Sequence, residues 1–320
     1  MEVTVILSVL LWFAAHFRFS EGYGRVVRDV RLQSKDSNRL TITVKTTSKF
    51  HESRARDIAD TWFQLAPENI FFFTDSFDDK LNKSLGGHLI NTGCGKGHSR
   101  DRLNCKTNAE LDLFTQRLSD WACHFDDDNY VNVKTLLNVL DLYDHNQDWY
   151  IGKSSTQRPV ELDTKNGKVT FWFATGGAGI CLSRALVRKM TKYVANGGFA
   201  KMGSYLSLPD DMLLGYLIIL KPIFSESIRL PIKETCQTSS LRHKLSVSLT
   251  TDNRFHSHFE DLALIDRFEL AEQVSLSAGS YDKQVHNLVD VPVAFSTEID
   301  KQRFRSLHCF LFSKRCPDIV

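Results

Sequence analysis

Apolar positions along the chain follow two alternating patterns, one typical of strands and one typical of helices. Short runs rich in β-branched or aromatic side chains predict strands at residues 40–47, 69–75, 87–92, 121–125, 149–152 and 169–174. Apolar residues spaced three or four apart predict helices at residues 51–65, 106–118, 133–143, 183–194 and 211–220. Because strands alternate with helices, the pattern predicts an α/β fold with a mixed, mostly parallel sheet flanked by helices.

Two stretches depart from this alternation. Residues 3–15 are almost wholly apolar, which is short for a membrane-spanning helix and typical of the core of a signal peptide. We therefore expect residues 1–20 to be a signal peptide or a short signal anchor; the alternative is a buried helix of the folded domain. Residues 221–253 are polar and lack periodicity, so we expect a loop or insertion there.

The charge balance argues against a nucleic-acid-binding protein, and the cysteine spacing argues against a structural zinc site. Lys and Arg number 40 against 38 Asp and Glu, so the basic excess expected of a nucleic-acid binder is absent. The 7 cysteines include no CxxC pair, which argues against a structural zinc site, and six of them could form three disulfides. Asn82 begins an N-glycosylation sequon, which is used only in the secretory lumen, where disulfides also persist.

Three consecutive carboxylates, Asp126, Asp127 and Asp128, follow the apolar strand at residues 121–125. Adjacent carboxylates repel one another and are costly to bury, and a divalent cation that prefers oxygen ligands would offset both effects. Ligands of α/β sheets commonly bind at the carboxyl ends of strands. The segment therefore predicts a cation site; the alternative is a solvated acidic turn that caps the next helix.

Two further pairs of polar residues are candidates for the same site. His256 and His258 would point to one side of an extended segment, where one imidazole could complete the metal ligands. The alternative is a pair of surface histidines. Asp210 and Asp211 open an apolar helix. One interpretation is that an aspartate here caps the helix, and the other is that it acts as a general base with a shifted pKa.

Two further regions contain candidate site residues: the segment after the first predicted strand, and a glycine-rich turn. Arg54 and Arg56 both follow the first predicted strand, where an anionic diphosphate would lie, and the sequence barely distinguishes them. Residues 171–179 join an aromatic strand to a glycine-rich turn, which allows close approach of a ligand to the backbone or simply forms a tight turn.

Taken in order, several blocks of the sequence resemble the fringe glycosyltransferases. The blocks are VKTTSKFHESR, DTW, FTD, CHFDDDNYV, FWFATGGAGICLSR, LPDD, FHSHFE and RFRSLHC. The resemblance covers residues 38–220 and 254–316 and implies one catalytic domain with a GT-A fold over residues 38–316. It also implies Mn²⁺-dependent, inverting transfer of N-acetylglucosamine from UDP-GlcNAc, in β-1,3 linkage, to O-linked fucose on EGF repeats of Notch-type receptors.

The resemblance assigns roles to five of the candidates. It implies that Asp211 is the catalytic base, that Arg54 and Asp126 bind substrate, and that Asp127 and His258 bind the metal. These residue types suit the reaction, because a carboxylate can deprotonate the acceptor hydroxyl while a metal ion stabilises the leaving UDP.

The resemblance also implies three disulfides and a compartment. The expected pairs are Cys94–Cys105, Cys123–Cys181 and Cys309–Cys316, which leaves Cys236 without a partner. The expected location is the lumenal side of the Golgi membrane, with a possible single-span anchor, or outside the cell if the N-terminus is cleaved.

Two departures from the family keep other functions open. The segment before His258 is longer than in the fringes, and Met212 stands where a fringe usually has cysteine. One alternative is a related β-1,3-galactosyltransferase-type enzyme. The other is an inactive module that binds sugar or Notch, although Asp126, Asp127, Asp211 and His258 are all present.

Overall fold

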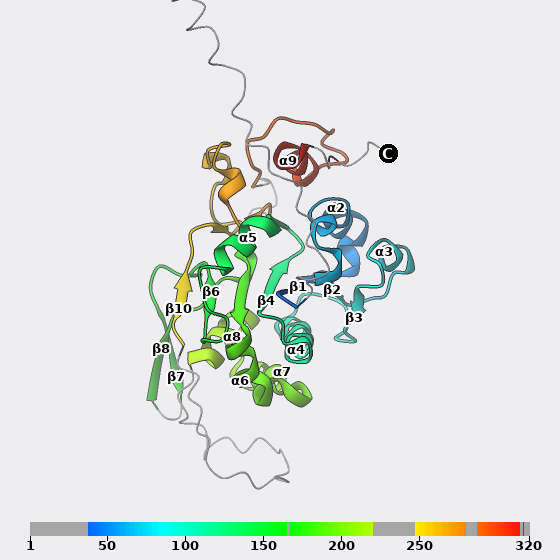
Figure 1. Ribbon diagram of the computed structural model, residues 1–320. Coiled ribbons are helices and arrows are strands. Elements are labelled where there is room, and N and C mark those ends of the chain that lie inside the picture. The colour runs from blue at the N-terminus through cyan, green and yellow to red at the C-terminus, as the bar shows by residue number, and fades with distance from the viewer. Residues whose placement is uncertain (1–37, 165–166, 220–246, 280–286, 314–315, 317–320) are drawn as a thin grey trace, which may run out of the picture.

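The computed structural model describes residues 38–164, 167–219, 247–279, 287–313 and 316 (Figure 1). The predicted signal segment at residues 1–20, Cys236 and most of the predicted insertion lie outside these residues. Across the described ranges, no helix combines the length and the hydropathy needed to cross a bilayer.

A seven-stranded sheet forms the centre of the domain, in the order β10-β6-β9-β4-β1-β2-β3. Its strands are β1 (Leu40–Lys45), β2 (Ile70–Thr74), β3 (Leu89–Asn91), β4 (Trp121–Asp126), β6 (Tyr150–Gly152), β9 (Ile180–Ser183) and β10 (Leu249–Thr251). β9 runs antiparallel to both of its neighbours, and the other pairings are parallel. The sheet is therefore mixed and mostly parallel, which confirms the predicted fold class.

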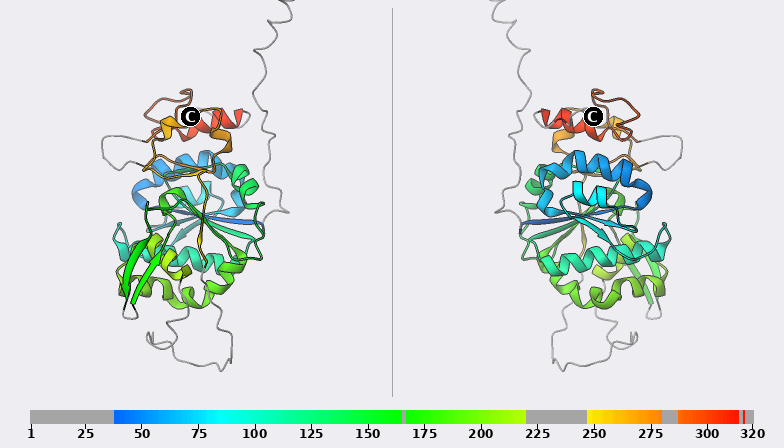
Figure 2. Two further views of the ribbon diagram at one scale, coloured as in Figure 1. Left: turned by 90° about the vertical axis from the view of Figure 1, so that its left-hand side faces the viewer. Right: turned by 90° about the vertical axis from the view of Figure 1, so that its right-hand side faces the viewer.

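Helices cover both faces of this sheet (Figure 2). One face carries α2 (Arg56–Asp60), α3 (Asp79–Ser84), α5 (Val133–Leu140) and α9 (Phe304–Leu311), and their buried side chains belong to one hydrophobic cluster. The other face carries α4 (Arg100–Arg117), α6 (Arg184–Val194), α7 (Gly198–Leu206) and α8 (Asp210–Ile219), which pack in a second cluster. The two cores, separated by the sheet, fix the strand ends in space.

Two smaller sheets are attached to this framework. β5 (Asn129–Val131) pairs with β12 (Ser275–Ser277), which also pairs with β11 (Phe255–His256). In this small sheet, β12 lies between the strand that follows the acidic triplet and the strand that contains His256. β7 (Val160–Thr164) and β8 (Gly167–Phe171) form a separate antiparallel hairpin.

The structure contains helices α3, α7 and α9, which the sequence pattern did not predict, and it also differs from the predicted elements as follows. Residues 169–174 were expected to add a strand to the main sheet, but β8 pairs only with β7, and among its residues only Phe171 is buried. The main-sheet strand is instead β9, which follows the glycine-rich turn and is wholly buried. The predicted helix at residues 51–65 consists of a π-helical turn, α2 and a 3₁₀ turn. Within the range predicted as an insertion, residues 249–251 form the edge strand β10.

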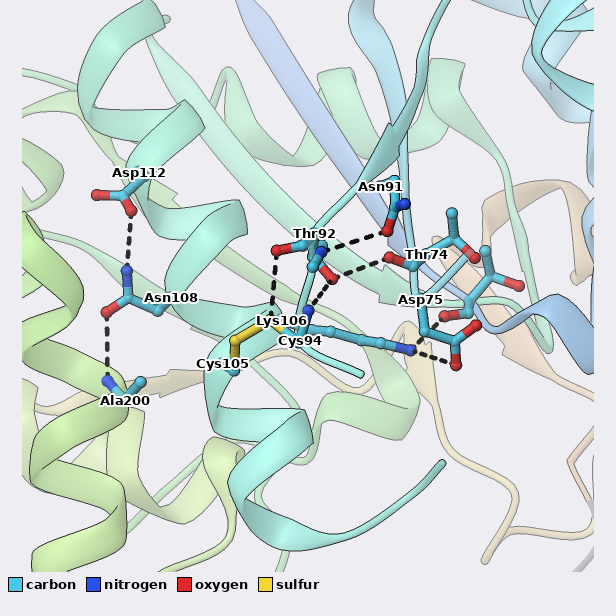
Figure 3. The surroundings of a disulfide bond; sticks show 12 residues. Thr74, Asp75, Asn91, Thr92, Cys94, Cys105, Lys106, Asn108, Asp112 and Ala200 are labelled. Atoms are coloured by element: carbon cyan, nitrogen blue, oxygen red, sulfur yellow. Dashed lines mark hydrogen bonds and ion pairs between the residues drawn. A yellow bond between two sulfur atoms is a disulfide. The ribbon is translucent and has the colours of Figure 1, made fainter. Parts of the chain in front are cut away.

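All three predicted disulfides are confirmed: Cys94–Cys105, Cys123–Cys181 and Cys309–Cys316. The second joins partners directly opposite each other in β4 and β9, so it holds the strand that carries the acidic triplet against the strand that follows the glycine turn. The first joins the segment after β3 to α4 (Figure 3).

Lys106 follows Cys105 and extends from α4 to the ends of the central strands (Figure 3). Its Nζ donates to the carbonyl of Thr46, at 2.8 Å, and pairs with Asp75 Oδ2, at 3.4 Å. Asp75 in turn accepts from the Thr47 hydroxyl and the Ser48 amide. The disulfide thus lies beside a buried polar network that fixes the backbone after β1.

We expect Gly179→Ala to lower the free energy of unfolding by about 3 kcal/mol, through backbone strain and a clash. Gly179 has φ +97°, and a β-carbon there would overlap the buried ring of Phe125. Gly167→Ala is the matched control, since φ is +109° and no atom lies within 4 Å of the added carbon. It should cost only about 1 kcal/mol. Chemical denaturation measures both, and equal losses would contradict the clash.

Candidate active site

A cleft of about 390 Å³ opens at the carboxyl end of β4. Its titratable lining residues are Lys45, His98, His124, Asp126, Asp210, Asp211 and His258. The structure therefore brings together three of the predicted site residues, Asp126, Asp211 and His258. They come from three distant parts of the chain, and a cleft at strand ends is the usual ligand site of such sheets.

The other two predicted site residues, Arg54 and Asp127, pair with each other beneath the acidic turn. Arg54 Nη1 donates to Asp127 Oδ1 at 3.0 Å and to Asp128 Oδ2 at 3.3 Å, and the Thr46 hydroxyl donates to Asp127 Oδ2 at 2.7 Å. Burial and the charge of Asp128 raise the pKa of Asp127 to about 7, although Arg54 opposes the shift. Of the two arginines left open by the sequence, the structure places Arg54 at the site.

Asp128 lies next to His258. A β-carbon added to Gly279 would lie 2.7 Å from Asp128 Oδ2 and 3.0 Å from His258 Cβ, so both side chains lie against this glycine. Burial and the charge of Asp126 raise the pKa of Asp128, against the attraction of Arg54 and His258. His256 has different surroundings, since its Nε2 is 2.9 Å from Gln273 Oε1.

These donors fit a hard divalent cation. The acidic triplet supplies carboxylate oxygens beside one imidazole, and a cation would relieve the cost of burying two carboxylates whose pKa values are raised. Among the described residues, no three His, Cys, Asp or Glu side chains converge closely enough to hold a metal alone. A cation at this site would therefore take further ligands from nucleotide phosphates or water.

Asp126 is held by a residue that sequence reasoning missed. His124 lies between Glu110 on α4 and Asp126, with Nδ1 2.6 Å from Glu110 Oε2 and Nε2 3.5 Å from Asp126 Oδ1. Burial opposes the charge on His124, but Glu110 outweighs it and raises the pKa of His124 to about 9. Burial likewise opposes ionisation of Asp126, yet His124 and Lys45 lower its pKa. Asp126 is therefore ionised at neutral pH.

The structure also distinguishes the two aspartates that open α8. Asp210 Oδ2 accepts from Lys45 Nζ at 2.6 Å and from the Thr107 hydroxyl at 2.7 Å. Burial opposes ionisation of Asp210, but the charge of Lys45 outweighs it and holds the pKa of Asp210 far below its usual range. Asp210 is therefore an ionised structural partner of Lys45 and is poorly suited to accept a proton.

Asp211 has the properties of a general base. Within the described residues, its carboxylate accepts hydrogen bonds from two backbone amides, those of Met212 at 2.7 Å and Gly176 at 3.4 Å. Burial and the neighbouring charge of Asp210 raise the pKa of Asp211 to about 6. A base with a pKa near the working pH is mostly ionised and still accepts a proton readily.

The glycine turn and the aromatic strand also contribute to the cleft. Gly176 and Gly177 line it, and a β-carbon at Gly177 would lie 3.2 Å from His258 Nδ1. Phe173 lines the cleft as predicted for its walls, while Phe171 is buried in the core and Trp172 is 41% exposed.

The predicted glycosylation residue, Asn82, lies on α3, away from the residues that line the cleft. Its Oδ1 accepts from the Leu89 amide at 3.1 Å. No described contact bears on modification, so glycosylation of Asn82 stays a prediction.

The site combines a carboxylate cluster, which suits a cation and a diphosphate, with a separate base. This combination is typical of a transferase that uses a nucleotide-activated donor. The group transferred follows from the family. A family profile described as Fringe-like matches residues 35–227 and 222–315, and the chain belongs to this family of glycosyltransferases.

Named relatives agree with this assignment. Lunatic fringe of Danio rerio, a β-1,3-N-acetylglucosaminyltransferase, is 42% identical over 288 residues, which are 88% of this chain and 71% of that protein. The fringe glycosyltransferase of Drosophila melanogaster is 43% identical over 279 residues, 85% of this chain and 62% of that protein. Radical fringe of Gallus gallus is 37% identical over 295 residues, 90% and 71% of the two chains.

Solved structures overlap with the chain only weakly. The Streptococcus pneumoniae TIGR4 glycosyltransferase GlyE has a TM-score of 0.43 at 12% identity, over 88% of this chain and 65% of that chain. The galactosyltransferase LgtC has a TM-score of 0.34 at 12% identity, over 55% and 69% of the two chains. At these TM-scores the structural overlap does not support assigning a function to the chain.

We expect kcat/KM to fall as the pH drops through about 6, because Asp211 must be ionised to accept a proton. A pH–rate profile measures this acidic limb. In Asp211→Asn, the rate should drop roughly 10²–10⁴-fold, and the part of the acidic limb near pH 6 should disappear, whereas a titration of Asp127 near pH 7 would persist. An acidic limb that persists unchanged in the variant would assign the titration to another group.

Proposed function

We propose that the protein transfers N-acetylglucosamine from UDP-GlcNAc to the 3-hydroxyl of O-linked fucose on EGF repeats of Notch-type receptors. The observation that carries the proposal is the position of Asp211, an isolated base with a raised pKa, in one cleft with Asp126 and His258. The names of the relatives supply the sugar and the β-1,3 linkage.

Each site residue then has a task in the reaction. Asp211 takes the proton of the acceptor hydroxyl while the hydroxyl oxygen attacks the anomeric carbon of the donor. Asp126, kept ionised by His124, orients the donor sugar or ribose through hydrogen bonds to its hydroxyls. Arg54 holds Asp127 and Asp128 in place and contributes positive charge near the diphosphate.

Asp127 and His258 would hold Mn²⁺, with Asp128 beside His258. When bound, the ion supplies Lewis-acid stabilisation of the departing UDP. Arg54 and Thr46 donate to the oxygens of Asp127, and Asp128 is the carboxylate beside His258. Asp127 would therefore exchange part of its contact with Arg54 when the donor enters.

A single base implies inversion at the anomeric carbon. Direct attack by the acceptor oxygen from the face opposite UDP needs one proton acceptor and no covalent intermediate. Asp210 is not available as a second carboxylate, because Lys45 and Thr107 hold it.

We further propose that the protein works on the lumenal side of the Golgi membrane or after secretion. Three disulfides among the described residues support an oxidising compartment. Attachment of a glycan at Asn82 would be consistent with the same compartment.

The experiment that tests the proposed function is UDP release from the purified protein with Mn²⁺ and UDP-GlcNAc. An O-fucosylated EGF repeat should stimulate release, and the unfucosylated repeat should not. A preference for UDP-Gal would instead indicate a galactosyltransferase-type enzyme. Tight UDP binding with no transfer to either repeat would indicate a binding module and overturn the proposal.

We expect Asp127→Ala to weaken Mn²⁺-dependent UDP binding by about 10–100-fold, since it removes a metal ligand and the partner of Arg54. Isothermal titration calorimetry measures the affinity with and without Mn²⁺. The control is Asp163→Ala, an exposed aspartate on β7, which should leave binding unchanged. Equal affinity of Asp127→Ala and the unaltered protein would assign the metal to other ligands.

A further inference from the structure

The segment that leads from β3 into the first turn of α4 is fixed and exposed. We call residues 94–102 the cationic loop, although residues 100–102 already belong to α4; every residue in it is exposed except the half-buried Cys94. The disulfide to Cys105 fixes its start against the second turn of α4. Gly95 and Gly97 have φ of +78° and +115°, so the backbone bends where other residues would be strained.

The cationic loop lies at the cleft that contains Asp211. His98 of the loop and Leu103, which follows it, line the cleft together with Pro209 and Met212. Arg100 Nη1 donates to the carbonyl of Ser207 at 2.7 Å, immediately before the segment that enters α8. The loop is thus tied to the segment that carries the base.

The described residues do not neutralise the charge of the cationic loop. Its cations are Lys96, Arg100 and Arg102, and its acid, Asp101, accepts from the Ser204 hydroxyl at 3.1 Å. In the described part of the chain, neither Lys96 nor Arg102 forms an ion pair with a carboxylate. By contrast, the cleft residue Lys45 is fully paired with Asp210.

We propose that the cationic loop docks an acidic stretch of the polypeptide that carries the acceptor sugar. The inference rests on the proposed function, because the acceptor hydroxyl must reach Asp211 and its polypeptide must then lie at the mouth of the cleft. The fixed loop reaches this mouth through His98, and its Lys96 and Arg102 have no carboxylate partner among the described residues, which favours an acceptor polypeptide with carboxylates near the modified residue. Such complementarity sets orientation and speeds encounter.

The test is the double charge reversal Lys96→Glu with Arg102→Glu, assayed on two acceptors. For an O-fucosylated protein domain with acidic residues beside the fucose, KM should rise about tenfold while kcat stays within twofold. For a small soluble fucoside, both constants should stay unchanged, because no polypeptide contacts the loop. Added salt should raise the KM of the unaltered protein for the acidic domain more than that of the variant.

Matched controls separate docking from folding. Lys301→Glu reverses an exposed charge just before α9, on the other side of the sheet, and should leave both acceptors unaffected. The milder pair Lys96→Ala with Arg102→Ala should raise KM for the acidic domain about threefold. Replacing the carboxylates of the acceptor domain with amides should abolish the difference between the variant and the unaltered protein.

Two negative results have different meanings. If the unaltered protein uses both acceptors and the double reversal leaves KM for the acidic domain unchanged, the docking inference is wrong and the proposed function stands. If the unaltered, folded protein transfers to neither acceptor, the proposed function is wrong and the docking inference falls with it.

Discussion

A buried ion pair between Lys45 and Asp210 underlies the geometry of the whole site. Lys45 ends the central strand β1, and Asp210 begins α8, so the 2.6 Å contact fixes the helix to the end of the sheet. Burying either charge alone would be costly, and the added hydrogen bond from Thr107 completes the pairing. With Asp210 held in this way, the next residue, Asp211, lines the cleft.

Buried charges shift the pKa values of two carboxylates that line the cleft, Asp126 and Asp211, in opposite directions. His124, made cationic by Glu110, keeps Asp126 ionised for contact with a donor. The negative charge of Asp210 and burial raise the pKa of Asp211 so that it can accept a proton. Environments that push carboxylate pKa values in opposite directions define separate binding and base roles within one cleft.

The sequence pattern predicted most of the central sheet, because strands such as β1, β2 and β4 are short runs rich in β-branched or aromatic residues. It missed β9, whose four residues lie between the predicted glycine turn, which ends at residue 179, and the predicted helix, which begins at residue 183. Ser183 does cap α6, with its Oγ accepting from the Leu186 amide. The strand became visible only through pairing with β4 and β6, which local pattern does not encode.

The site was predictable where its chemistry lies in short motifs, as for the acidic triplet and the aspartates that open α8. Lys45, Glu110 and His124 were missed because none of them belongs to a recognisable catalytic or metal-binding motif of the sequence. The available signal was a charged or imidazole side chain at an inward position of an apolar strand, as in Lys45 and His124. Their shared function depends on contacts between β1, β4 and α4, which only the fold brings together.

The central claim is that Asp211 acts alone as a base in a direct displacement. Proton NMR of the disaccharide formed from UDP-GlcNAc tests it most directly, because the configuration of the new glycosidic bond is fixed once it forms. The account predicts a β configuration at the new anomeric carbon, inverted from the α-linked donor. An α-linked product would require a second displacement or a front-face reaction and would contradict the role assigned to Asp211.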